Sequence, residues 1–366
     1  SSSSTFRITR QIKISSFVNS FVFEAEITPG MGVEEFCELA TAVEDAGFDR
    51  LGVSDVALWP DTYQLQVLAA QSTKNIMIGS MVTNPYTRNP AVHASALATL
   101  NDASDGRAFF GVGVGAGLEE IGINPTRPVA TLRETITVIR SLLNGEETFF
   151  QGSVFNFNTS GLVVPRKGMV PVAIGTRSPQ VMRLAGEIAD IALVGARNLS
   201  PSSVANYKQW LSEGADLVGR DVSEVKIAPR VTLCVSEDSE LAHSSVKRYA
   251  AHYLEIVGEN GPEVEQVRKN EIFKALSRSR GWYFDHNRFD DPELESLVDD
   301  ELVKEFAIVG TSGEVAEQLA EVLNLGFSQI SCNLAAVRRT GSSMAEGLLE
   351  TIKGSGLAIE LLRNNR

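Results

Sequence analysis

The stretch IGSMVTNPYTRNPAVHASALATLNDASDGRAFFGVGVG, residues 78–115, contains the repeating unit that decides the fold. It begins with a short apolar run, continues with an amphipathic segment at residues 90–103, and ends in a second apolar run at residues 106–115. Apolar positions at helical spacing indicate a helix, and short apolar runs of this kind indicate buried strands. The stretch therefore predicts a strand, a helix and a second strand.

The same alternation extends over the whole chain. Eight short runs rich in apolar and β-branched residues are expected to form strands, at residues 11–18, 48–55, 75–82, 106–115, 170–175, 190–196, 225–236 and 327–335. A longer amphipathic segment follows each run, and the one after the seventh is expected to be a single helix at residues 240–257. Strands this apolar are typical of a parallel sheet covered by helices.

Eight strand–helix units in 366 residues predict a (β/α)8 TIM barrel with insertions, as one domain over residues 1–366. A doubly wound sheet is the competing architecture, but the number of units and the lack of a mid-chain linker favour the barrel. Two insertions are expected: a small hairpin at residues 147–158, and a polar, aromatic segment at residues 258–303, before the eighth unit, where barrels often carry a lid. Residues 1–10 are expected to be a disordered leader.

The composition excludes several classes of function. Hydrophobic residues make up 43% of the chain and charged residues 22%, which is typical of a soluble globular protein. The net charge of −13 argues against binding to nucleic acids or to anionic membranes, and no apolar run reaches the roughly 18 residues of a membrane span. Three widely separated cysteines argue against a metal site or a disulfide framework, so we expect a cytoplasmic protein.

Alternating glycines at Gly111, Gly113, Gly115 and Gly117 raise the question of a nucleotide-binding loop. A dinucleotide fingerprint needs a third glycine where this chain has Ala116 or Leu118, depending on the register, so we exclude it. Glycine at every second position leaves one face of a strand without side chains. That face could make room for a flat ligand or for close packing, and the residues alone do not decide between the two.

Three blocks of sequence, at residues 78–115, 170–196 and 300–319, together resemble the bacterial luciferase-like family. The motif TNPYTRNP within the first block is similar to the deazaflavin-dependent branch that includes the methylenetetrahydromethanopterin reductases. The resemblance implies a (β/α)8 barrel that binds coenzyme F420 or FMN at the carboxyl ends of its strands. It also implies a small-molecule substrate and, often, a homodimer formed through the second and third barrel helices.

The resemblance assigns a cofactor site residue by residue. It implies a non-proline cis peptide bond between Met81 and Val82 behind the ring, with Thr83 and Asn84 beside the ring edge. The remaining positions that it implies are Asp55 in contact with the ring system, Gly113 and Gly115 beneath the ring, and Gly175, Thr176, Arg177, Gly195 and Ala196 around the phosphate. Free amides at a glycine turn that opens a helix suit a phosphate independently of the resemblance.

The chain departs from its relatives at two positions where they often carry a titratable group. Ala116 replaces an acid after the glycine-rich strand, and Val56 replaces a histidine after Asp55. Glu119 is then the nearest candidate general acid, provided that it is buried against apolar walls. Asn19 and Trp59 are candidate substrate contacts, whereas we assign His93, on the third helix, to packing.

These observations leave three hypotheses about the function. The first is an F420-dependent oxidoreductase that transfers a hydride between C5 of the deazaflavin and a small organic substrate. The second is an FMN-dependent monooxygenase that receives reduced flavin from a partner reductase. The third, which Ala116 and Val56 keep open, is a cofactor-binding barrel that has lost catalysis.

Overall fold

A closed barrel of eight parallel strands forms the centre of the molecule. The computed structural model describes residues 21–163, 168–195, 199–258, 261–278 and 292–364. In order around the barrel, the strands are β1 (Val22–Ile27), β2 (Arg50–Val53), β3 (Met77–Ser80), β4 (Ala108–Val112), β7 (Val172–Thr176), β8 (Ile191–Gly195), β9 (Lys226–Val235) and β11 (Gln329–Leu334). Strand β9 pairs with both β8 and β11 and so closes the barrel. The predicted (β/α)8 architecture is confirmed.

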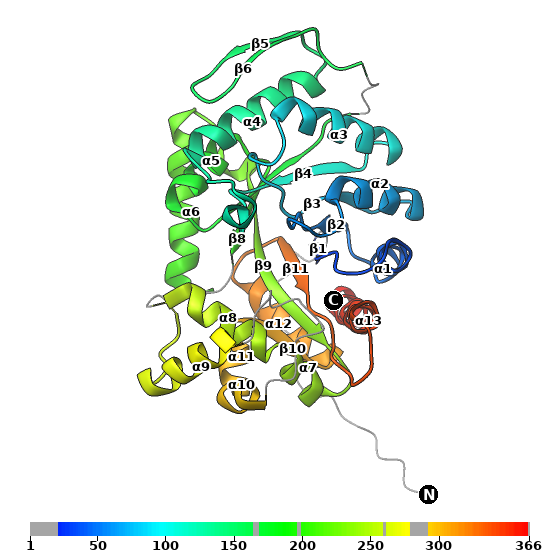
Figure 1. Cartoon of the computed structure of the whole chain (residues 1–366), viewed down its shortest axis with the longest axis vertical. Helices are drawn as coiled ribbons and strands as arrows, with labels where there is room; N and C mark the ends of the chain where they lie inside the picture. Colours follow the sequence, from blue (N-terminus) through cyan, green and yellow to red (C-terminus); the bar gives the residue numbers. More distant parts are fainter. Residues whose placement is uncertain (1–20, 164–167, 196–198, 259–260, 279–291, 365–366) are drawn as a thin grey trace, which may run out of the picture.

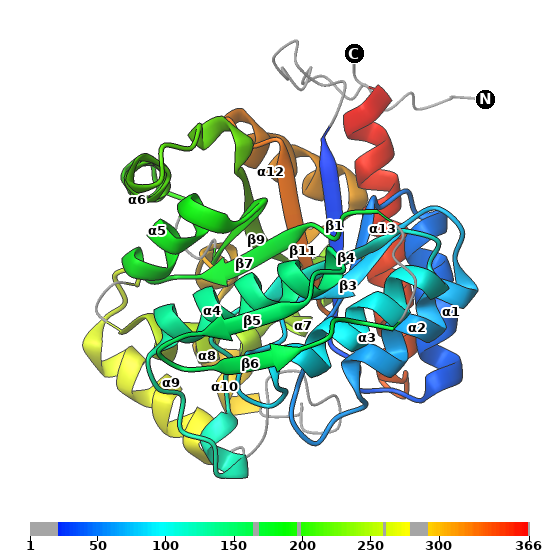
Figure 2. The same cartoon turned by 90° about the horizontal axis from the view of Figure 1, so that it is seen from above.

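Eight helices surround the barrel, as Figures 1 and 2 show. They are α1 (Val33–Asp45), α2 (Thr62–Ser72), α3 (Pro90–Ala103), α4 (Pro128–Leu143), α5 (Pro179–Ile188), α6 (Pro201–Leu217), α12 (Ser312–Asn324) and α13 (Met344–Asn364). Their buried faces share one hydrophobic core with the outward residues of the strands, such as Phe23, Ala25 and Ile27 of β1. Among the described residues, no helix is long and apolar enough to cross a membrane.

The first strand lies elsewhere than predicted. The barrel uses residues 22–27, with the sequence VFEAEI, whereas residues 11–18 lie outside the described residues. In this strand Phe23, Ala25 and Ile27 alternate with Glu24 and Glu26, and all five side chains are buried. The prediction assumed that strands buried on both faces are apolar throughout, and two buried carboxylic acids concealed this one.

A ninth parallel strand, β10 (Ala307–Gly310), extends the sheet outside the barrel. It pairs with the second half of β9, a strand of ten residues. The prediction had no strand here because AIVG is short and precedes a strong helix signal.

The two insertions are present. Strands β5 (Thr148–Gln151) and β6 (Asn156–Thr159) form the predicted hairpin, which lies outside the barrel over α4 (Figures 1 and 2). The helix expected at residues 240–257 is broken at Val246 into α7 (Ser239–Ser245) and α8 (Lys247–Val257). In the described part of the insertion, α9 (Gln266–Arg278), α10 (Pro292–Leu297) and α11 (Asp300–Lys304) follow.

Helices α7 to α11 and β10 build a second hydrophobic cluster beside the barrel. Tyr249 and Tyr253 of α8 are buried in it, with ring centroids 4.3 Å apart. Trp59, from the loop after β2, packs against the same cluster. The insertion is therefore anchored next to a loop at the carboxyl end of the barrel, and its role as a lid stays a prediction.

Candidate active site

The interior of the barrel has an apolar side and a polar side. Residues that point away from the outer helices alternate with those that face them, as the pleat of a strand requires. The apolar side is formed by Met81, Phe109, Ala173, Ile191, Leu193 and Ala228. The polar side, on β1, β9 and β11, is formed by Glu24, Glu26, Arg230, Thr232, Ser331 and Asn333. In barrels of this type the mouth at the carboxyl ends of the strands carries the chemistry.

An ion pair in the barrel interior joins β1 to β9. Arg230 Nε lies 2.6 Å from Glu26 Oε2, and its Nη2 lies 2.8 Å from Oε1. The Ser54 hydroxyl donates to the same carboxylate at 3.1 Å. Burial opposes the charge on Arg230, but the Glu26 carboxylate outweighs it and holds the pKa of Arg230 well above its usual value.

One buried acceptor on the polar side has no hydrogen-bond partner among the residues that the structure describes. The Asn333 amide nitrogen donates to the Thr232 hydroxyl at 2.9 Å. Its Oδ1 accepts no hydrogen bond from the described residues, although the side chain is fully buried. A buried carbonyl oxygen in a polar setting is a natural acceptor for water or for a ligand N–H or O–H.

The segment Met81–Asn84 crosses the mouth directly after β3. The Met81–Val82 peptide bond is cis, as the resemblance implied. Thr83 is fixed to β4 by two backbone hydrogen bonds of 2.9 Å, from its N–H to the Gly111 carbonyl and from the Gly113 N–H to its carbonyl. Val82 packs at the edge of the apolar side and is half-buried.

Gly111 in β4 and the glycines in the loop directly after it make room for this segment. A Cβ at Gly111 would clash with the Ser80 carbonyl oxygen, and one at Gly113 would lie 3.0 Å from Val82 Cγ2. At Gly115 it would meet the side chains of Asn84 and Leu118, each at 3.0 Å. The bare face of the strand is thus filled by protein, so Gly113 and Gly115 support the segment behind the expected ring and leave no open space for it.

Asp55 lies at the centre of a polar group on the rim. Its Oδ2 accepts the Thr83 hydroxyl at 2.6 Å and Arg88 Nη1 at 2.7 Å. Arg88 Nη2 reaches Asp61 Oδ2 at 2.6 Å. Four residues from two neighbouring loops are therefore joined around the carboxylate assigned to the ring system.

His93 holds the same loop from the helix side. Its Nε2 lies 3.0 Å from the Asn84 carbonyl oxygen, and its Nδ1 lies 2.8 Å from the Tyr63 hydroxyl. Because a carbonyl only accepts, Nε2 carries the hydrogen and Tyr63 donates to Nδ1. Burial lowers the pKa of His93 to about 4, so the ring is neutral at physiological pH. The packing role predicted for His93 is confirmed, with a hydrogen-bonding role that the sequence did not reveal.

The expected phosphate turn follows β7. Ser178 caps α5 by accepting the Val181 N–H at 3.4 Å, and its own N–H donates to the Thr176 hydroxyl at 3.0 Å. Arg177 is exposed and packs beside Gly195, where a Cβ would lie 3.0 Å from Arg177 Cγ. Gly175, Thr176, Arg177 and Gly195 thus lie together at the ends of β7 and β8, whereas Ala196 lies outside the described residues.

The expected role of Glu119 as a general acid is not supported, whereas the expected substrate contacts of Trp59 and Asn19 stay predictions. Glu119 lies on the 3-10 helix η2 (Leu118–Ile121) and is exposed, so the apolar burial that its role as a general acid required is missing. Trp59 packs against the insertion and close to Gly30, where a Cβ would lie 2.7 Å from its ring. Asn19 lies outside the described residues.

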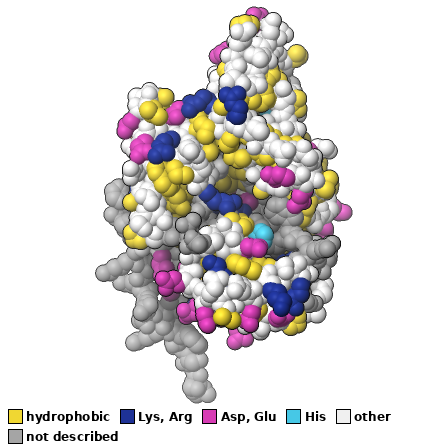
Figure 3. Space-filling model, turned by 60° about the vertical axis from the view of Figure 1, so that its left-hand side comes forward, with side chains coloured by type: hydrophobic (Ala, Val, Ile, Leu, Met, Phe, Trp, Pro, Cys, Tyr) yellow, Lys and Arg dark blue, Asp and Glu magenta, His cyan; other side chains and the backbone are white. Residues whose placement is uncertain are grey.

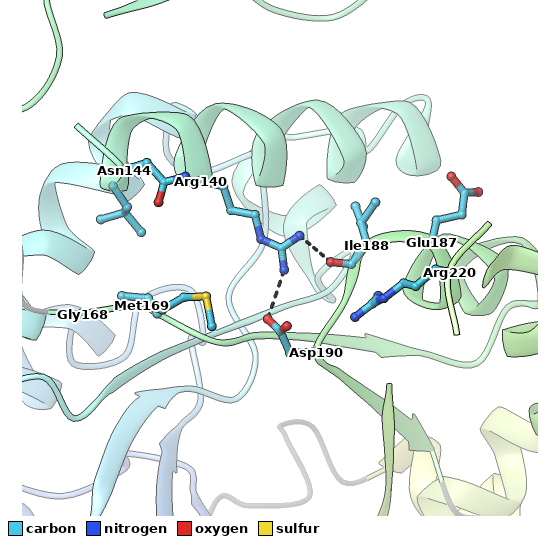
Figure 4. A pocket seen from close by; sticks show the side chains of 10 residues that line it. Arg140, Asn144, Gly168, Met169, Glu187, Ile188, Asp190 and Arg220 are labelled. Carbon is cyan, nitrogen blue, oxygen red and sulfur yellow. Dashed lines mark hydrogen bonds and ion pairs between the residues drawn. The ribbon is translucent and has the colours of Figure 1, made fainter. Parts of the chain in front are cut away.

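One cavity away from the mouth is lined by arginines that already have partners. Arg140 and Arg220 point into a cavity of about 340 Å³ near the amino end of β8 (Figure 4). Both are already bonded to the C-terminal turn of α5: Arg140 to the Ile188 carbonyl at 2.6 Å, and Arg220 to the Ala189 carbonyl at 2.7 Å. These arginines stabilise a helix end. No group of three metal-binding side chains occurs in the described part of the chain.

The face that carries α5, α6 and α8 in Figure 1 is hollowed at its centre, and basic and acidic side chains surround the hollow (Figure 3).

Glu26, Arg230 and Arg88 are site residues that were not predicted from the sequence. Arg88 was visible inside the motif TNPYTRNP, and the alternation in VFEAEI marked Glu26. Arg230 had no local signal.

Comparison with known proteins places this barrel in a family. The profile of the luciferase-like monooxygenases matches residues 12–329. A 5,10-methylenetetrahydromethanopterin reductase of Methanolobus tindarius is 30% identical over 315 residues, which cover 84% of this chain and 92% of that reductase. An F420-dependent glucose-6-phosphate dehydrogenase of Nakamurella multipartita is 28% identical over 235 residues, or 60% of this chain and 69% of the dehydrogenase.

A solved structure shows the same fold. The coenzyme F420 dependent tetrahydromethanopterin reductase from Methanopyrus kandleri superposes with a TM-score of 0.77 at 24% identity, covering 92% of this chain and 98% of the reductase. The family profile spans most of the chain, and the barrel expected of that family is present. The chain therefore belongs to the luciferase-like monooxygenase family.

Proposed function

We propose that this enzyme is an oxidoreductase that binds coenzyme F420 in the barrel mouth and acts on a small organic substrate. The observation that carries the proposal is the arrangement of the rim. Val82 and the Met81–Asn84 segment form one wall, and Asp55 stands beside them with its Oδ1 unbonded by any described residue. The similarity to F420-dependent relatives supports the choice of cofactor.

The residues present fit such a cofactor. The half-buried Val82 offers an apolar surface for a flat ring, and Asp55 offers an acceptor for a ring N–H or O–H. The turn Gly175–Thr176–Arg177, with Gly195 beside it, offers donors and a cation for a phosphate at the start of α5. When bound, the deazaflavin would supply a carbon that accepts or donates a hydride.

The protein's own contribution would be orientation and the exclusion of water. The apolar side positions the ring, while Arg230, Glu26 and Asn333 face the space across from it and can bind a polar group of the substrate. Transfer between two carbons depends mainly on their alignment. The exposed Glu119 is not part of this proposal.

An FMN-dependent monooxygenase, supplied with reduced flavin by a partner reductase, is the alternative that the family description supports. We also propose a homodimer through α2 and α3, where Leu68 and Val92 are 37% and 55% exposed. Light scattering at a mass near the 39.6 kDa of one chain would count against the dimer.

Direct titration separates the two cofactors. Purified protein is titrated with F420 and, separately, with FMN, and binding is followed by quenching of cofactor fluorescence. We expect micromolar binding of F420 and none of FMN. Micromolar binding of FMN alone would favour the monooxygenase, and binding of neither would favour a barrel that has lost catalysis.

A further inference from the structure

We propose that Arg88 is a positioning residue for the cofactor, acting through the carboxylate of Asp55. This inference rests on the proposed function, because it concerns the same rim. Arg88 lies in the loop between β3 and α3, outside the residues that form the apolar side and the polar side of the barrel interior. Its effect on a ligand would therefore be transmitted by the residues that it holds.

The guanidinium of Arg88 is enclosed on three sides. Its Nη1 lies 2.7 Å from Asp55 Oδ2, its Nη2 lies 2.6 Å from Asp61 Oδ2, and its carbon lies 5.2 Å from the centre of the Tyr63 ring. The Arg88 side chain is only 19% exposed. Burial opposes its charge, but the two carboxylates outweigh this effect and raise the pKa of Arg88. The cation is thus permanent and fixed.

Asp55 is left with one oxygen for a ligand. Oδ2 receives both Arg88 and the Thr83 hydroxyl, whereas Oδ1 has no partner among the described residues. The side chain is 12% exposed, so little of it is solvated. Two donors on one oxygen fix the plane of the carboxylate and direct the other oxygen. An acceptor that is oriented before binding loses little conformational entropy when the ligand arrives.

Arg88 also holds the loop that carries Asp55. Asp61 caps α2 by accepting the Gln64 N–H on Oδ1, and it gives Oδ2 to Arg88. One planar guanidinium therefore fixes both ends of the loop at residues 55–61. A lysine, as a compact point charge, could pair closely with only one of the two carboxylates.

The Thr83–Asn84 segment is held from the opposite side as well. His93 donates to the Asn84 carbonyl at 3.0 Å and is itself held by Tyr63, the residue on which Arg88 lies. The side chain of Asn84 accepts the N–H groups of Tyr86 and Thr87, both at 2.9 Å. With the backbone anchored in this way, the orientation of Asp55 becomes the specific contribution of Arg88.

A double-mutant cycle tests this role. The dissociation constant for F420 is measured for the wild type, Arg88→Met, Asp55→Asn and the double variant. We expect Arg88→Met to raise the dissociation constant about tenfold, and to raise it less than about twofold when Asp55 is already asparagine. Arg88→Lys should recover part of the loss. Arg183→Met is the matched control, because it breaks a 2.7 Å ion pair with Glu213 on the outer helices and should leave binding unchanged.

Thermal unfolding of the same proteins separates positioning from folding. If Arg88→Met lowers the melting temperature but leaves the dissociation constant unchanged, or weakens binding equally in both backgrounds, Arg88 does not act through Asp55. If the wild type binds F420 and Arg88→Met binds it with the same dissociation constant, only this inference is overturned. A wild type that binds neither F420 nor FMN overturns the proposed function together with it.

Discussion

Glu24 is a buried carboxylic acid in the barrel interior, and its pKa is raised. Its side chain is buried, and its Oε1 accepts the Ser331 hydroxyl at 2.7 Å. Burial raises the pKa of Glu24 from 4.5 to about 7, against the opposing effects of Arg50 and the Ser331 hydrogen bond. A carboxyl group whose pKa is higher in the folded than in the unfolded state destabilises the fold as the pH rises.

Replacing Glu24 by glutamine should remove that penalty. Between pH 4.5 and about 7 the folded protein binds more protons at Glu24 than the unfolded chain, so the free energy of unfolding falls with rising pH. We expect Glu24→Gln to match the wild type near pH 4.5 and to exceed it by up to about 3 kcal/mol at pH 8, measured by urea unfolding. The exposed Glu38→Gln is the control. A difference that does not change with pH would contradict this assignment.

At the residue scale, the family resemblance assigned cofactor contacts to positions that a contiguous motif marks, and these roles stay predictions. Met81, Val82, Thr83 and Asn84 form one segment at the end of β3, and Asp55 bonds to Thr83. Arg230 could not be predicted, because its partner Glu26 lies 204 positions away and only the closure of the barrel brings them together. The burial on which the role of Glu119 depended could not be judged from the sequence, since exposure depends on how the loop after β4 folds.

At the scale of an element, the turn of the β5–β6 hairpin is held by one carboxylate of α4. Its turn contributes backbone N–H groups of Ser153, Val154 and Phe155, which donate to the Glu134 carboxylate of α4 at 2.7, 2.9 and 2.8 Å. The Ser153 hydroxyl adds a fourth hydrogen bond at 2.7 Å. Burial opposes ionisation of Glu134, but these hydrogen bonds outweigh it and lower its pKa.

Glu134→Gln should release this turn. The amide nitrogen of glutamine cannot accept, so some of the backbone donors lose their partner, at about 1–3 kcal/mol. We expect faster hydrogen exchange at Ser153, Val154 and Phe155 than in the wild type. In the wild type the protection of these amides, relative to the intrinsic exchange rate at each pH, should be lost only as the pH falls through the lowered pKa of Glu134. Glu146→Gln, which loses one bond from the Ser141 hydroxyl, is the control. Unchanged exchange at Ser153, Val154 and Phe155 in Glu134→Gln would show that the Glu134 carboxylate does not hold the turn.

The sequence predicted elements well where periodicity was strong. The outer helices and the hairpin follow from local patterns, and so do seven of the barrel strands. The first strand was misplaced because two buried glutamates break the apolar run, and their burial depends on partners in β9 and β11. The break at Val246 and the added strand β10 likewise depend on tertiary packing in the second cluster.

At the scale of the whole molecule, closure of the barrel brings the apolar side and the polar side of the interior to face each other. The apolar side comes mainly from the middle of the chain, and the polar side comes from β1, β9 and β11. Neither side forms a site by itself, and the family resemblance alone pointed only to the apolar side. We therefore expect the deazaflavin ring to lie between Val82 and the polar side, and the phosphate of the cofactor to lie at the turn before α5.

A crystal structure of the protein with bound F420 tests this claim most directly. The account predicts the deazaflavin ring against Val82, a hydrogen bond from the ring system to Asp55 Oδ1, and the phosphate near Gly175, Arg177 and Gly195. A ring bound elsewhere, for example in the cavity lined by Arg140 and Arg220, would contradict it. So would an empty mouth at saturating F420.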